Sequence, residues 1–186
     1  MIQCNLTKIF GQLIQNKIKL IKIGNKNMVP FKSRTRKVKK SWIDYNGHMN
    51  VSYYTLVFDN AIDEFLEKAI GIGPTFIGSY NQGSYALQTQ YRYLRELLLG
   101  DSFFVSIFVA DFTPKRLHLM SQIICPPGQQ AAASCETIMV NVDLKKRQSC
   151  QYPKFAYDKI SELYRASKAL RLSTPIGQPI GLRKSV

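Results

Sequence analysis

The segment Asp44-Tyr45-Asn46-Gly47 places a carboxylate in a turn sequence directly before an amphipathic stretch. Asp, Asn and Gly favour tight turns, so the chain is expected to reverse here. A helix that begins after such a turn offers free backbone N–H groups and a partial positive charge at its first residues. Attack on a carbonyl group needs these two parts together: a nucleophile or base, and N–H donors that face the developing oxyanion.

Asp44 is therefore the candidate catalytic residue, and the backbone N–H of Val51, with neighbours at Asn50 or Ser52, is the candidate oxyanion donor. Gly47 gives the backbone the freedom to make the corner. Asp44 could attack a carbonyl group to form an anhydride or could direct water as a general base. The turn pattern alone favours a competing interpretation, in which Asp44 is only a turn residue or a helix cap.

The helix that must carry these donors is predicted over Asn50–Ile70, where apolar residues recur at steps of three and four. Asn50 or Ser52 can cap its start, and Gly71 or Gly73 with Pro74 ends it. A first strand, Ser33–Ile43, is expected to lead into the turn.

The remaining chain is predicted to be mostly strand. After a loop through Gly78, Asn81 and Gly83, four strands joined by short turns are expected at Ser84–Leu97, Ser102–Phe112, Arg116–Cys125 and Ala131–Leu144. A closing helix is predicted over residues 154–171, with Phe155, Ile160, Leu163, Tyr164 and Leu170 on its apolar side. Strands without intervening helices indicate an α+β fold, in which one long helix covers a face of an antiparallel sheet.

The positive charge of the chain belongs to its ends. The net charge is +14, yet residues 41–144 hold more acidic than basic side chains, while residues 1–40 hold eleven Lys and Arg and no acid. A nucleic-acid-binding module is expected to carry its basic residues on one face of a fold. We therefore expect no nucleic-acid partner, although basic tails could still meet a polyanion.

We expect two parts in the chain: a basic, disordered extension over residues 1–27, and one domain over residues 28–186. Lysines interrupt every apolar run of the extension, which excludes a membrane span there. The four cysteines show no C-x-x-C pair and no His at metal-ligand spacing, so no metal site is expected. Unpaired cysteines fit a reduced, cytoplasmic protein.

The stretch Trp42–Ala61 resembles the first motif of the 4-hydroxybenzoyl-CoA thioesterase family. In that family a strand ends in Asp-x-x-Gly and the next turn starts the central helix. The matching residues here are Asp44 and Gly47, followed by the Gly-His-x-Asn variant at His48-Met49-Asn50.

A narrower resemblance points to the betainyl-CoA thioesterases, including those fused behind carnitine dehydrogenases. It is carried by Gln88–Gly100, by Lys115–Leu119 and by the closing Pro-x-Gly-x-x-Ile-Gly pattern of Pro175–Gly181. The 186 residues hold no dehydrogenase domain.

The resemblance implies a hotdog fold: a five-stranded antiparallel sheet wrapped around one long central helix, plus a C-terminal helix. It implies hydrolysis of an acyl-CoA thioester to the free acid and CoA, with Asp44 and the Val51 N–H in the catalytic roles and no cofactor besides the CoA thioester itself. It also implies a homodimer or a dimer of dimers, in which the partner's Gly83–Leu87 lines the acyl pocket.

A betainyl group carries a trimethylammonium, which aromatic faces bind through their quadrupole. The candidate substrate-binding residues are aromatic or polar side chains of the motif and of the first hairpin strand: Trp42, Tyr45, His48, Asn50, Tyr54 and Tyr85. Lys115 and Arg116 are candidate contacts for the CoA phosphates. Each of these residues also has an ordinary structural interpretation. The aromatic side chains could pack in the core, His48 could be structural, Asn50 could cap the helix, and Lys115 and Arg116 could be solvated.

Three functions stay open from the sequence. The first is an acyl-CoA thioesterase, the second is a hotdog module that binds acyl-CoA without hydrolysing it, and the third is a nucleic-acid binder that depends on the basic ends. The resemblance favours them in that order.

Overall fold

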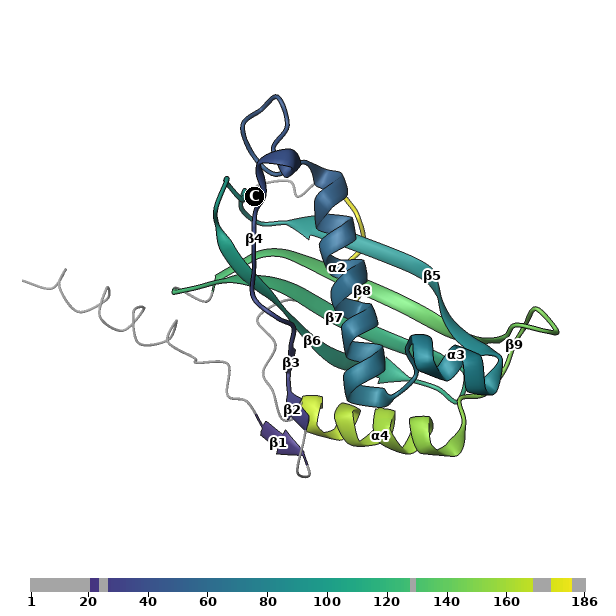
Figure 1. Cartoon of the computed structure of the whole chain (residues 1–186). Coiled ribbons are helices and arrows are strands. Elements are labelled where there is room, and N and C mark those ends of the chain that lie inside the picture. The colour runs from purple at the N-terminus through teal and green to yellow at the C-terminus, as the bar shows by residue number, and fades with distance from the viewer. Residues whose placement is uncertain (1–20, 24–26, 128–129, 169–174, 182–186) are drawn as a thin grey trace, which may run out of the picture.

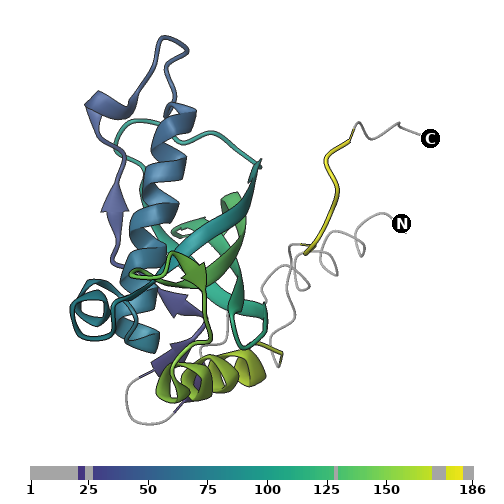
Figure 2. The same cartoon turned by 90° about the vertical axis from the view of Figure 1, so that its right-hand side faces the viewer.

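A computed structural model describes residues 21–23, 27–127, 130–168 and 175–181. The described chain forms two layers, a curved antiparallel sheet and a long helix, α2, that lies across one face of it (Figures 1 and 2). The α+β hotdog arrangement expected from the sequence is confirmed.

The central helix has nearly the predicted bounds. α2 spans Val51–Phe65 and continues as a π-helical turn, η2, over Leu66–Ile70. Its sheet-facing side is buried at Tyr54, Val57, Phe58, Ala61, Ile62 and Phe65. The predicted apolar spacing therefore identifies the face that α2 buries.

The sheet has the strand order β3-β6-β7-β8-β5, and every neighbouring pair is antiparallel. The strands on this path are β3 (Phe31–Lys32), β5 (Gln82–Tyr93), β6 (Ser102–Phe112), β7 (Arg116–Cys125) and β8 (Gln130–Asp143). Two short strands join it: β4 (Arg36–Lys37) pairs with β6, and β9 (Gln148–Ser149) pairs with β8. β5 ends the path, which makes it an edge strand.

The prediction of one first strand over Ser33–Ile43 is wrong in detail, because β3 and β4 are separate and a 3-10 turn, η1, occupies Lys40–Trp42. The cause lies at Ser33. Its hydroxyl accepts the backbone N–H of Val105 at 2.9 Å, in place of a main-chain carbonyl. A side chain thus takes a position in the ladder, and the strand is interrupted.

The predicted strand Ser84–Leu97 also needs correction, since β5 ends at Tyr93. The N–H groups of Leu94 and Arg95 both donate to the carbonyl of Ala132, at 2.9 and 3.1 Å, so the backbone turns away from the ladder there. The next residues cross toward the start of α2, where the carbonyl of Leu97 accepts the N–H of Met49 at 2.8 Å.

Two further helices lie near the C-terminal end of α2 (Figure 1). α3 (Pro74–Tyr80) forms where a loop was expected, with Pro74 in its first turn. α4 (Lys154–Lys168) forms as predicted within the described residues, and Ile160 and Leu163 are buried. Phe155 was expected on its apolar side, but it is exposed at one edge and meets the rings of Phe76 and Tyr80 in α3.

The expected extension, residues 1–27, lies mostly outside the described residues. Its described part belongs to a small hairpin in which β1 (Ile21–Ile23) pairs with β2 (Asn27–Val29). Among the described residues, no helix combines the length and the apolar composition needed to cross a bilayer.

The end of α2 depends on a close backbone approach at Gly73. A Cβ added to Gly73 would lie 2.6 Å from the Cβ and 2.9 Å from the Cα of Glu67, atoms that cannot move aside. At Gly78, inside α3, an added Cβ would meet nothing within 4 Å.

Gly73→Ala should therefore lower the free energy of unfolding by about 1–3 kcal/mol through overpacking. Gly78→Ala is the matched control, and it should be neutral or stabilise the protein by up to about 1 kcal/mol, because Ala is the better helix former. Urea unfolding followed by circular dichroism measures both. Equal effects of the two variants would contradict the prediction.

Candidate functional site

The turn that precedes α2 is closed by its own backbone. The N–H of Asp44 donates to the carbonyl of His48 at 3.1 Å, and the N–H of Gly47 donates to the carbonyl of Asp44 at 3.0 Å. Gly47 has φ +84°, a left-handed conformation that side chains other than glycine rarely adopt. The chain therefore reverses within four residues, as the sequence predicts, and returns directly to the helix.

The turn is also attached to the rest of the fold. The N–H of Asn50 donates to the carbonyl of Trp42 at 2.8 Å, and Met49, fully buried, donates its N–H to the carbonyl of Leu97. These bonds fix the distance between the turn and the first residue of α2.

The carboxylate of Asp44 faces the start of α2 and is partly exposed. One oxygen accepts the backbone N–H of Asn46 at 2.8 Å. The other accepts the side-chain amide of Asn50 at 3.4 Å. Asp44 is thus a turn residue, as the competing interpretation holds, and it also lies beside the helix terminus, as the catalytic interpretation requires.

Asn50 is the helix cap. Its amide oxygen accepts the N–H of Ser52 at 3.0 Å and also contacts the Ser52 hydroxyl. The N–H of Tyr53 is taken by the carbonyl of Asn50. Val51, the first helical residue, has no acceptor for its N–H within the helix, and 55% of its surface is exposed. This N–H therefore remains the candidate oxyanion donor.

Trp42 is a core residue. It is buried, its ring stacks on Tyr53 at a centroid distance of 5.3 Å, and Phe103 and Lys39 also lie against it. A ring so enclosed does not offer a free face to a substrate cation.

Two further predicted substrate-binding residues lie on the turn. Tyr45 follows Asp44 in the turn, and 96% of its surface is exposed. His48 is half-buried, and its Nδ1 lies 3.2 Å from the Met49 carbonyl, a contact that fits a structural role.

A row of tyrosines lies between α2 and the end of β5. Tyr54, in the first turns of α2, meets Tyr93 edge-to-face at 5.2 Å, and Tyr93 lies beside Tyr91 with near-parallel rings 6.5 Å apart. The hydroxyl of Tyr91 hydrogen-bonds to the side chain of Thr55. Burial raises the pKa of all three tyrosines, so they are neutral phenols at physiological pH.

Tyr93 is the exposed member of this row, with 48% of its surface open to solvent. Tyr91 and Tyr93 were expected on the strand but were not among the candidate site residues. Because Tyr91 and Tyr93 are two positions apart on a strand, their side chains are expected on the same face of the sheet. The sequence of the strand alone does not identify the helix that covers this face.

Tyr85 lies far from Asp44 of its own chain. It is at the other end of β5 from Tyr93, about 26 Å away along the strand. Its hydroxyl accepts a hydrogen bond from Arg147 at 3.1 Å. The register shift between Ala86 and Gln88 also places it on the face of the sheet opposite to Tyr91, because Tyr85 pairs with Val140 and Tyr91 with Cys135.

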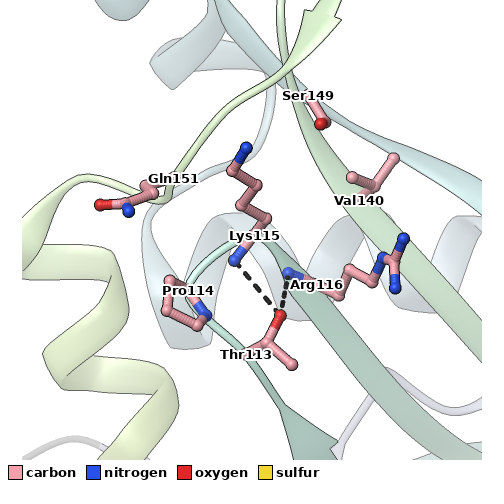
Figure 3. Close-up of a pocket in the computed structure, with 7 residues that line it drawn as sticks. All are labelled: Thr113, Pro114, Lys115, Arg116, Val140, Ser149 and Gln151. Atoms are coloured by element: carbon pink, nitrogen blue, oxygen red, sulfur yellow. Dashed lines mark hydrogen bonds between the residues drawn. The ribbon is translucent and has the colours of Figure 1, made fainter.

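Lys115 and Arg116 line a pocket of about 420 Å³ (Figure 3). Its other residues come from the turn between β6 and β7 and from the neighbouring strands: Thr113, Pro114, Val140, Ser149 and Gln151. The Thr113 hydroxyl accepts the N–H of Arg116 at 3.0 Å and so fixes the turn. This turn is at the end of β6 remote from the Asp44 turn (Figure 1). A single chain therefore does not bring the predicted phosphate contacts to the predicted catalytic residue.

The buried cysteines fit structural roles. Cys125 and Cys135 are free and buried, and burial raises the pKa of Cys135 to about 11, which keeps it a thiol. Across the described residues, His, Cys, Asp and Glu side chains nowhere form a group of three that could hold a metal.

Comparison with known families gives one match over most of the domain. A family model described as the thioesterase-like superfamily matches residues 38–160. The betainyl-CoA thioesterase of Pseudomonas aeruginosa is 28% identical over 145 residues, which cover 78% of this chain and 91% of that protein.

A fused relative and a solved structure extend the comparison. The L-carnitine dehydrogenase/betainyl-CoA thioesterase of a Rhizobium species is 26% identical, over 84% of this chain but only 31% of its own length. The hypothetical protein SAV2348 from Staphylococcus aureus, solved in complex with CoA, superposes with a TM-score of 0.75 at 25% identity, covering 82% of this chain and 95% of that one.

Proposed function

The chain belongs to the thioesterase-like superfamily, and we propose that it hydrolyses an acyl-CoA thioester to the free acid and CoA. One observation carries the proposal: the Asp44 carboxylate is held beside the first turn of α2, whose Val51 N–H has no acceptor within the helix. The names of the relatives support the same reaction class.

In this proposal the thioester carbonyl oxygen binds at the Val51 N–H. Negative charge that develops on this oxygen is stabilised by the N–H and by the positive end of the helix dipole. Asp44 either takes a proton from the attacking water or attacks the carbonyl itself to form an anhydride that water then opens. In both routes the C–S bond breaks and CoA leaves as the thiolate. The thiolate is then protonated by the proton that Asp44 took from water or, in the anhydride route, by the proton that is released when water opens the anhydride.

We propose betainyl-CoA as a substrate, because relatives that share most of this domain carry that name. In a betainyl group the trimethylammonium is separated from the carbonyl by one methylene, so it must bind within a few ångströms of Val51. Tyr54 follows Val51 by about 4.5 Å along the helix axis, and Tyr93 packs against it with half of its surface exposed. The Tyr93 ring is thus the aromatic face offered to the cation.

We further propose that the protein is a homodimer formed through β5. This strand has twelve residues, and in the described part of the chain no strand pairs with its outer edge. Exposed side chains along it include Tyr85, Leu87 and Tyr93. A long apolar edge of this kind is a pairing site that monomeric proteins avoid.

Antiparallel pairing of β5 with its two-fold copy would bring the Tyr85 end of one chain beside the Tyr93 end of the other. The partner's end of the sheet, which carries Arg147 as well as Lys115 and Arg116, would then approach the Asp44 turn. This arrangement would supply cations for the CoA phosphates from the partner subunit.

Replacing Asp44 tests the catalytic proposal. Asp44→Asn should lower kcat by about 10²- to 10⁴-fold, because the amide cannot act as base or nucleophile, while it can still accept the N–H of Asn46. The matched control is Asp143→Asn, since Asp143 also accepts turn N–H groups, from Lys145 and Lys146. Hydrolysis of a panel of acyl-CoAs, followed by release of the CoA thiol, measures the effect.

The control variant should keep full activity, and both variants should unfold at similar urea concentrations. Acyl-CoA binding without hydrolysis by the unmodified protein would favour the non-catalytic alternative and contradict the proposal.

A second substitution tests the cation site. Tyr93→Leu should lower kcat/KM for betainyl-CoA by about 5- to 30-fold, which corresponds to about 1–2 kcal/mol of lost cation–π attraction. Hydrolysis of 3,3-dimethylbutyryl-CoA, the uncharged isostere, should change little. Tyr93→Phe, which keeps the ring, should retain the preference, and a parallel loss on both substrates would contradict the assignment.

A third substitution tests the dimer. Leu87→Arg places a charge on the exposed edge of β5 and should halve the mass measured by light scattering. Turnover should fall with it, because the site needs groups from both subunits. Leu87→Met keeps an apolar side chain and should remain dimeric, whereas a single-chain mass for the unmodified protein would overturn the arrangement.

A further inference from the structure

The segment Pro175–Gly181, here called the C-terminal strap, lies on the face of the sheet away from α2, as the yellow ribbon in Figure 2 shows. The sheet holds it through its backbone. Arg92 donates to the carbonyls of Pro175 and Gln178, at 3.0 and 2.9 Å, and Gln90 donates to the same Gln178 carbonyl at 3.0 Å.

Glu136 on β8 completes this attachment. Both of its carboxylate oxygens accept the N–H of Gly177, at 2.9 and 3.0 Å. His118 on β7 lies 2.8 Å from the same carboxylate and orients it. Donors from β5 and an acceptor from β8 thus meet one short segment, and His118 of β7 contacts the acceptor.

The shape of the strap depends on Gly177. Its φ of +68° is in the left-handed region, and the resulting turn directs the carbonyls of Pro175 and Gln178 toward Arg92. The Pro-x-Gly pattern recognised in the sequence therefore has a structural counterpart, to which the catalytic proposal assigns no role.

The strap contacts the half of β5 that carries the tyrosines. Along this strand, Gln90 and Arg92 reach outward to the strap, while Tyr91 and Tyr93 alternate with them and face α2. The register shift between Ala86 and Gln88 separates this half from the rest of β5, and the chain leaves the sheet after Tyr93. Among the described residues, β8 is the one strand that pairs with the Gln88–Tyr93 half of β5.

We propose that the C-terminal strap is a positioning element, which holds the Gln88–Tyr93 half of β5 against the sheet and thereby fixes Tyr93 beside α2. Arg92 and Glu136 are the positioning residues. The effect on turnover rests on the proposed function, whereas the effect on the strand does not.

Two full-length variants test the proposal. In Gly177→Ala a side chain must adopt the left-handed conformation, which is unfavourable for residues other than glycine. Gly181→Ala is the matched control, because an added Cβ meets nothing within 4 Å at either position and Gly181 has no positive φ. Arg92→Met removes the donors to the strap and keeps an apolar stem. Hydrogen exchange by mass spectrometry compares peptides of Gln88–Tyr93 with peptides of β6.

Gly177→Ala and Arg92→Met should each speed exchange in Gln88–Tyr93 by about tenfold and leave β6 protected, and Gly181→Ala should change neither. Unchanged exchange in Gln88–Tyr93 for both variants would overturn the proposal. If Arg92→Met also loses protection in β6, it is unfolded, and Gly177→Ala decides alone.

The selectivity for betainyl-CoA over 3,3-dimethylbutyryl-CoA separates positioning from general stability. A displaced Tyr93 should lower this ratio about 5-fold in both variants, whereas a merely structural defect lowers both rates equally and would overturn the link to the site. If the unmodified protein hydrolyses neither substrate, the proposed function fails, and hydrogen exchange still tests the strap.

Discussion

The geometry of the candidate site depends on the side chain of one residue, Asn50. Its oxygen satisfies the N–H of Ser52 at the start of α2, and its nitrogen reaches the carboxylate of Asp44. One amide thus joins the turn to the helix that follows it. The backbone N–H of Asn50 also donates to the carbonyl of Trp42. Moving the turn away from the helix would therefore break several hydrogen bonds at once. The carboxylate of Asp44 is thereby held beside the first turn of α2.

The elements of the fold that the sequence predicts well are those in which local pattern and tertiary environment agree. The stretch Asn50–Ile70 has helical spacing along its whole length, and β6 and β7 have the predicted bounds because turn residues delimit apolar runs. The broken first strand could not be predicted in this way. It results from a bond between the Ser33 hydroxyl and Val105, seventy-two positions away.

The residues of the candidate site were likewise predictable where they are close in sequence and not predictable where they come from distant segments. Asp44, Gly47, Asn50 and Val51 are neighbours in sequence, so their proximity was predictable from the turn and cap signals. The row of tyrosines was not predictable, because it forms only when the end of β5 meets the sheet-facing side of α2. Trp42 shows the reverse error: its place beside the motif suggested a ligand contact, but stacking on Tyr53 makes it part of the core.

The extra residue in β5 at the Ala86/Gln88 register shift has a consequence for how this strand can vary. In a regular strand, Tyr85 and Tyr91 would project from the same side, and a change in one would be felt by the packing around the other. The bulge breaks this parity, so the strand behaves as two short modules with separate surroundings, one next to Arg147 and one next to α2. Substitutions at Tyr85 are therefore expected to affect the contact with Arg147, and substitutions at Tyr93 the contact with α2.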